Sequence, residues 1–136
     1  MYELFDHTAD LGLRVTATTL DELFVDAAEG LFAMIVDRPE TIEPRVEERF
    51  DIPGEDRAFL LFDWLRALLT KSEIDGTVFG KFEVRVRDDG LTATANGEPL
   101  DPDKHGLGRE VKAITYHELK VEQTPAGWLA EVIVDI

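Results

Sequence analysis

The sequence has 136 residues, of which 44% are hydrophobic and 32% are charged. This length and composition are typical of one soluble domain with a buried core, and they argue against a disordered chain. The formal net charge of −15 argues against a protein that binds nucleic acid through a basic surface, because the electric field of so acidic a chain would repel phosphate. The absence of cysteine excludes disulfides, thiolate zinc sites and cysteine nucleophiles.

Two further absences bear on location. No stretch approaches the ~20 apolar residues that span a bilayer, so no membrane partner is expected. The first residues lack a basic segment followed by an apolar run, which a secretory signal would require. Together with the lack of cysteine, these features favour a cytoplasmic protein. The acidic charge favours a cation or a basic protein as the partner.

The first part of the chain predicts two strands and a helix. Residues 2–5 read YELF, a short strand, and apolar and polar residues then alternate over 11–17 as in a half-buried strand. Thr19 and Glu22 form the T-x-x-E capping box at the start of a helix. Apolar side chains then recur at helical spacing as far as about Val36, which makes one apolar stripe.

The middle of the chain continues with a strand, a helix and a hairpin. Residues 45–52 predict the strand, and Pro53-Gly54 ends it. The helix spans about 55–72, and its apolar residues cover so wide an arc that we expect burial on more than one side. A hairpin follows over 82–95, with Asp88-Asp89-Gly90 as its turn.

The last third predicts a polar loop over 97–109 and two strands around 111–121 and 128–136. Consecutive strands joined by short turns indicate antiparallel pairing, and two helices can cover one face of such a sheet. The expected fold class is therefore α+β. We expect a single domain over residues 1–136, with a mostly antiparallel sheet and two long helices packed on one face.

Acidic residues near the two ends of the sequence form a candidate metal site. Asp10 continues the polar side of the 11–17 strand, and Asp135 shares the side of Glu131 in the last strand. If these strands are neighbours, both carboxylates converge with the main-chain carboxylate of Ile136. The repulsion between anions held so close must be offset by water, by a lysine or arginine, by a shared proton or by a cation. Oxygen-only ligands suit Ca²⁺, Mg²⁺ or Mn²⁺ rather than zinc.

Simpler interpretations of the same residues remain open. Asp6 and Asp10 also suit the capping of turns. His7 also suits a half-buried histidine with an ordinary hydrogen-bond partner, and Asp135 a solvated acid at a strand end. Asp101-Pro102-Asp103 resembles a calcium loop only superficially, because the required spacing and the distal glutamate are absent, and we interpret it as a turn.

Lys112 interrupts an apolar strand in the segment VKAITYHEL. It is either an ordinary exposed lysine or a cation near the acids, where it would neutralise them or meet a partner's phosphate. The common motifs of hydrolases, P-loop enzymes, dinucleotide-binding enzymes and zinc proteases are absent from the sequence. We therefore predict no catalytic residue.

Four segments, taken in order, resemble the archease family over nearly the whole chain. They are FDHTADLGLRV, TLDELFVDAAEGLFAMIVD, EVKAITYHEL and the closing VDI. The resemblance implies an α+β protein that is not itself an enzyme. It implies an activator of a GTP-dependent tRNA-splicing RNA ligase, which promotes guanylation of the ligase and multiple turnover, with a carboxylate-bound divalent cation.

The resemblance also assigns roles to individual residues. Asp10, Asp135 and the Ile136 carboxylate are expected as metal ligands, and His7 as a possible neighbour of that site. Lys112 is expected to be needed for ligase activation. The expected partner is the ligase, a protein, without direct contact to nucleic acid.

Two other functions remain as alternatives. The first is a metal-dependent phosphate-ester hydrolase, which would turn over substrate without a partner. The second is a chaperone-like adaptor without chemistry, which would need exposed apolar surface.

Overall fold

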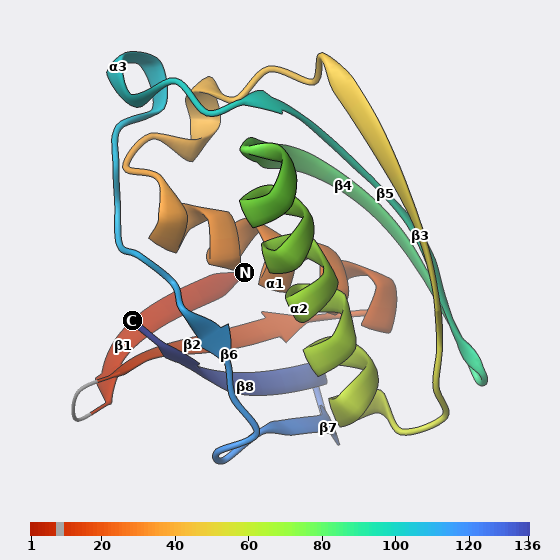
Figure 1. The fold of residues 1–136 in the computed structure, drawn as a ribbon. Helices are drawn as coiled ribbons and strands as arrows, with labels where there is room; N and C mark the ends of the chain where they lie inside the picture. The colour runs from red at the N-terminus through yellow and green to blue at the C-terminus, as the bar shows by residue number, and fades with distance from the viewer. Residues whose placement is uncertain (8–9) are drawn as a thin grey trace.

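Two antiparallel sheets enclose two long helices (Figure 1). The computed structural model describes residues 1–7 and 10–136, and of His7 only the backbone. Helices α1 (Leu20–Ile35) and α2 (Arg57–Asp75) lie between the sheets and pack on one face of each. The predicted α+β fold with antiparallel pairing and two packed helices is confirmed, with the strands divided between two sheets.

The first sheet brings together strands from both ends of the chain. Its order is β1-β2-β8-β6, and β7 also pairs with β8. β2 and β8 are antiparallel neighbours from Leu11 opposite Val134 to Ala17 opposite Trp128. The strands of this sheet are β1 (Tyr2–His7), β2 (Asp10–Ala17), β6 (Ala113–Ile114), β7 (Lys120–Thr124) and β8 (Gly127–Asp135).

The prediction of one continuous strand over 111–121 is wrong. β6 and β7 pair with different parts of β8, and the chain between them leaves the ladder. The N–H group and the hydroxyl of Thr115 both donate to the Ile133 carbonyl, at 3.0 and 2.8 Å. Glu118 then takes a φ of 54°, a left-handed conformation that a strand does not contain.

The second sheet has the order β3-β5-β4. The predicted hairpin is confirmed and is longer than expected, because its pairing runs from Arg87 opposite Gly90 to Thr77 opposite Pro99. The prediction of a loop over 97–109 is partly wrong, since that segment begins in β5 and contains a short helix. The elements are β3 (Val46–Pro53), β4 (Thr77–Arg87), β5 (Gly90–Pro99) and α3 (Pro102–His105).

Local capping explains where the long helices begin and end. The Thr19 hydroxyl accepts the Glu22 N–H at 3.2 Å, which confirms the predicted capping residue of α1. Asp56 caps α2 in the same way, through the Phe59 N–H at 3.1 Å. α2 ends at Gly76, whose φ of 66° is left-handed and favours glycine.

No helix in the described part of the chain is long and apolar enough to cross a membrane.

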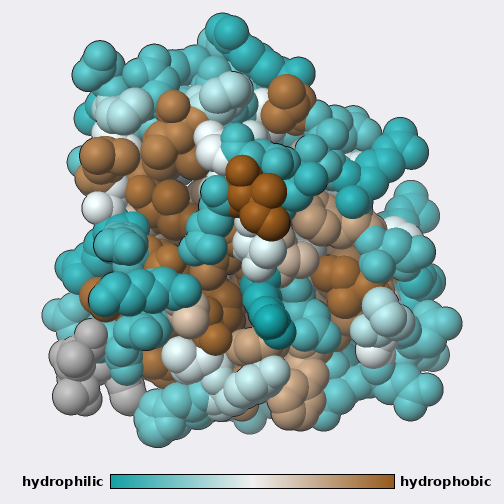
Figure 2. Space-filling model, in the orientation of Figure 1, coloured by the Kyte–Doolittle hydropathy of each residue, from teal (hydrophilic) through white to brown (hydrophobic). Residues whose placement is uncertain are grey.

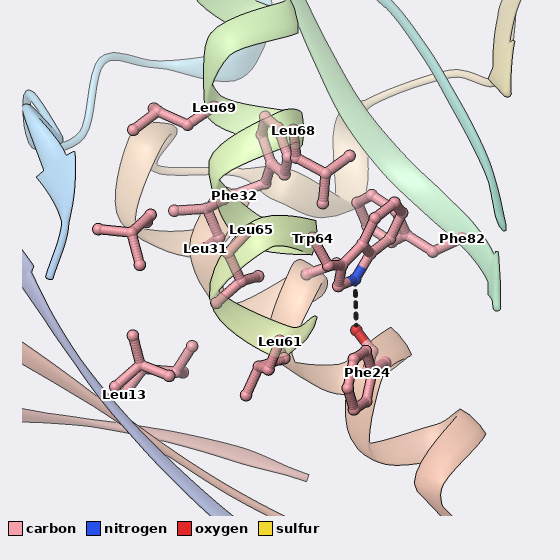
Figure 3. Packing of buried hydrophobic residues seen from close by; sticks show 14 of the residues in the cluster. Leu13, Phe24, Leu31, Phe32, Leu61, Trp64, Leu65, Leu68, Leu69 and Phe82 are labelled. Carbon is pink, nitrogen blue, oxygen red and sulfur yellow. Dashed lines mark hydrogen bonds between the residues drawn. The ribbon is translucent and has the colours of Figure 1, made fainter. Parts of the chain in front are cut away.

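Trp64 on α2 joins the elements of the core (Figure 3). It is fully buried, and its indole N–H donates to the Phe24 carbonyl of α1 at 3.1 Å. Its ring meets Phe50 edge-on, with ring centres 5.2 Å apart, and meets Phe82 in the same way at 6.3 Å. α2 is therefore held by α1 and by β3 and β4, which confirms its expected burial on more than one side.

A smaller apolar contact covers the other face of the first sheet. Phe5 is opposite Gly12, and Gly12 is opposite Ile133. A side chain at position 12 would collide with the Phe5 ring. Ile133 is only 1% exposed although it points away from the main core. The Arg14 guanidinium lies 4.6 Å from the centre of the Phe5 ring. The neighbouring strands β1, β2 and β8 are thus packed on both faces.

Replacement of Trp64 by Phe is expected to lower the free energy of unfolding by about 2 kcal/mol or more, because it leaves a void and removes the indole donor. Trp128→Phe is the matched control. Trp128 is half-buried and lies against Arg57, so its replacement is expected to change stability by less than about 1 kcal/mol. Urea unfolding of both variants measures the difference, and equal losses would contradict the central role of Trp64.

Candidate functional site

Asp10 and Asp135 lie next to each other at one end of the first sheet. The β2–β8 ladder pairs Leu11 with Val134, and the same register one residue further sets Asp10 opposite Asp135. Opposed residues of an antiparallel pair have Cα atoms about 4.5–5.5 Å apart and side chains on one face. Leu11 and Val134 are buried in the core, so the two carboxylates lie on the outer face. Asp135 is exposed and Asp10 is half-buried.

On the side of β8 away from β2, Asp135 is paired with the segment that contains Lys112. Ala113 is opposite Asp135 in the ladder, and the Lys112 N–H donates to the Asp135 carbonyl at 2.7 Å. The half-buried side chain of Ile136 packs against the core. Figure 1 shows the C-terminus beside the end of β2 that carries Asp10. The end of the sequence and the start of β2 therefore lie together, as the predicted metal site requires.

The Lys112 side chain lies on the α2 side of this segment. It lines a hollow together with Arg66 and Thr70 of α2. The ion pairs of the described residues include none between Lys112 and either Asp10 or Asp135. The described residues thus show no direct contact by which the lysine neutralises the acid pair, and its contact with a partner's anion stays a prediction.

The donor atoms at this end of the sheet fit a hard cation. In residues 1–6 and 10–136, no three His, Asp or Glu side chains gather closely enough to hold a metal ion. The pair supplies two carboxylates, and the third donor of the predicted set is the main-chain carboxylate of Ile136. Calcium takes about 6–8 oxygen ligands, so these donors leave room for ligands from water or from a partner.

The prediction for His7 concerns a side chain that lies outside the described residues. Its backbone pairs with Asp10 across β1 and β2. The role of His7 as a neighbour of a metal site stays a prediction.

A second polar cluster, which sequence reasoning missed, centres on the buried side chain of Glu98. Its carboxylate accepts the Glu43 N–H at 2.7 Å, the Lys104 ammonium at 2.9 Å and the His105 ring at 2.9 Å. The other ring nitrogen of His105 accepts the Asp101 N–H at 3.0 Å, so the ring donates to Glu98 through Nε2. These bonds, first that from Glu43, lower the pKa of Glu98 to about 2.

The Glu98 cluster positions the segment that leads to Lys112. It anchors α3 on β5, and the Arg38 N–H donates to the His105 carbonyl at 2.8 Å. The N–H groups of Gly108 and Arg109 then bond to the last turn of α1, at 2.9 and 2.7 Å. The cluster is thus structural. The sequence places Glu98 and His105 in one short segment, but nothing in their spacing shows that this segment folds back.

A model of the Archease protein family matches residues 2–136. The chain belongs to the archease family. The protein archease of Methanopyrus kandleri is 42% identical over 139 residues, which cover 99% of each chain. That of Pyrococcus furiosus is 44% identical over 140 residues, which cover 99% of this chain and 98% of the relative. The resemblance that the sequence motifs suggested is therefore confirmed.

Solved archease-family folds agree with the architecture described above. The solution structure of Methanobacterium thermoautotrophicum protein 1598 has a TM-score of 0.83 at 37% identity and covers 99% of this chain and 98% of that one. The crystal structure of an archease from Thermotoga maritima, described as a possible chaperone, has a TM-score of 0.68. At 21% identity, with 100% of this chain and 98% of that one covered, it supports the fold alone.

The lowered pKa of Glu98 predicts a pH dependence of stability. Because the folded-state pKa is about 2 and the ordinary value is 4.5, this group stabilises the fold fully above about pH 4.5. That contribution is lost as the pH falls towards 2. Glu98→Gln is expected to lower stability at pH 7 and to flatten its decline between pH 4.5 and 2. Glu83→Gln, at an exposed position of β4, is the control, and identical profiles in urea unfolding would contradict the assignment.

Proposed function

We propose that this chain is a non-catalytic activator of a GTP-dependent tRNA-splicing RNA ligase. It would promote guanylation and multiple turnover of the ligase, with a divalent cation held by Asp10, Asp135 and the Ile136 carboxylate. The observation that carries the proposal is the β2–β8 register, which sets the two aspartates opposite each other in a chain of the archease family.

The position of the acid pair suits action on a partner better than action alone. The pair lies at the end of a sheet, with Asp135 exposed, so another protein can approach it. The donors leave coordination positions open, which ligase or nucleotide oxygens would complete. A divalent cation in such a place stabilises negative charge on phosphate oxygens.

The net charge supports the same partner. A protein that binds RNA needs a basic surface, and a chain with a net charge of −15 is attracted to such a surface. The charge that disfavours direct RNA binding therefore favours rapid encounter with an RNA-binding enzyme. The description of the Thermotoga maritima archease as a possible chaperone also suits an accessory role.

Replacement of either aspartate is expected to reduce activation of the ligase. Asp10→Asn and Asp135→Asn keep the shape of the side chain but remove a charged ligand, so each should slow formation of the ligase–GMP adduct by about tenfold or more. Labelled GTP and purified ligase measure the rate. Asp88→Asn, in the exposed β4–β5 turn, is the control and should leave activation unchanged.

Equal activation by all three variants would remove the carboxylate pair from the mechanism. Turnover of a phosphate ester by the protein alone would instead favour the hydrolase alternative.

Addition of residues after Ile136 is expected to weaken binding of Ca²⁺ or Mn²⁺, because the added chain converts the terminal carboxylate into an amide. Isothermal titration measures the affinity. The control is the same extension placed before Met1, whose amine bonds to Thr16 at the far end of the β1–β2 pair. If the two extended variants bind the cation with equal affinity, Ile136 is not a ligand and the site consists of the two aspartates.

A further inference from the structure

A hollow of about 310 Å³ lies between α2 and the segment that pairs with the end of β8. Phe62, Leu69 and Ile114 give it apolar walls, and Arg66, Thr70 and Lys112 bring polar groups to it. A second hollow adjoins it, since both are lined by Leu69, Glu73 and Lys112. Figure 2 shows this side of the molecule, where apolar surface is visible among polar side chains.

Three cations around these hollows have no acidic partner among the described residues. Within the described part of the chain, Arg66, Arg109 and Lys112 form no ion pair, although Glu73 and Glu110 also line the hollows. Most other arginines and lysines are paired, for example Arg45 with Glu43 at 2.7 Å. The other described cations without an ion pair are Arg38, Lys81 and Arg85. In a chain with about twice as many acids as bases, three such cations at one place form a local site that attracts an anion.

Two exposed aromatic rings, Tyr116 and Phe59, are linked to the wall of the same hollow through Phe62. Tyr116 stacks on Phe62, with ring centres 4.0 Å apart, and Phe62 itself lines the hollow. Phe59 meets Tyr116 edge-on at 5.4 Å. Tyr116 is 57% exposed and Phe59 is 52% exposed. An exposed aromatic ring is a surface on which a nucleobase can stack.

We propose that this hollow binds one nucleotide. Arg66 and Lys112 would hold its phosphate, Thr70 would donate its hydroxyl to a phosphate oxygen, and the base would lie against Tyr116. A guanidinium fork and an ammonium are the usual protein ligands of phosphate. The proposal goes beyond ligase activation, because it concerns binding by this chain alone.

The size and charge of the site favour a mononucleotide over longer or different anions. A net charge of −15 opposes a long polyanion, because each further phosphate adds repulsion from the acidic chain. A carboxylate of a partner protein would form ion pairs with the cations but would not stack on the exposed ring. The combination of phosphate ligands and a stacking surface therefore selects a nucleotide.

The test uses the purified chain without ligase, in EDTA, so that the proposed cation site plays no part. Titration with GMP is followed by amide chemical shifts in ¹⁵N-labelled protein. We expect the shifts to concentrate in residues 66–73 and 109–116, and inorganic phosphate to compete with GMP. Guanosine, which lacks the phosphate, should bind at least about tenfold more weakly.

Matched variants separate a specific site from general charge. Arg66→Ala should weaken GMP binding about tenfold, whereas Arg85→Ala, which removes an equally unpaired and exposed cation from β4, should change it less than about twofold. Tyr116→Leu keeps apolar bulk without the aromatic face and should weaken binding about fivefold. The spectrum of each variant reports whether it is folded.

Several outcomes would overturn the proposal. They are the absence of localised shifts, equal effects of Arg66→Ala and Arg85→Ala, tighter binding of a six-nucleotide RNA than of GMP, and tighter binding of an oligoglutamate peptide. Because no ligase is present, the proposal can fail while the guanylation experiment succeeds, and the two results remain distinguishable.

Discussion

The pairing of β2 with β8 is the interaction on which the rest of the molecule depends. It joins residues from the two ends of the sequence in the centre of one sheet, and it sets the register by burying Leu11, Leu13, Val132 and Val134 against the helices. A slip of one residue would turn these side chains to the outer face and would carry Asp10 and Asp135 apart. The core therefore fixes the relative position of the acids, although neither acid belongs to it.

The fold was predictable where local patterns and tertiary packing agree. The cap of α1 at Thr19 and the turn at Asp88–Gly90 appear as expected, because each is set by neighbouring residues, although the Glu22 side chain of the predicted capping box accepts from the Thr18 hydroxyl. The division of the strands into two sheets was not predicted, since the wide apolar arc of α2 indicates burial on several sides but not which strands lie on each side. The break after Ile114 was also missed, because it arises when Thr115 bonds twice to one carbonyl of β8.

The candidate site shows the same limit. Alternation along the two end strands placed Asp10 and Asp135 on the polar side of each, and only the sheet order then decides that they are adjacent. The side on which the Lys112 side chain lies could not be read from the sequence, because it depends on the packing of α2 against this segment. The Glu98–His105 contact and the exposed stack of Tyr116 on Phe62 likewise join segments whose approach depends on the whole fold.

Packing on both faces of the first sheet bears on ion selectivity. Gly12 leaves room for the Phe5 ring, and Ile133 lies buried on the same outer face, two residues before Asp135. The backbone that carries the carboxylates is thus packed on both faces, whereas the carboxylates themselves can turn about their side-chain bonds. Such adjustable ligands, in the site as proposed, would suit the flexible coordination of Ca²⁺ at about 2.3–2.6 Å better than the near-ideal octahedron at about 2.0–2.1 Å that Mg²⁺ requires.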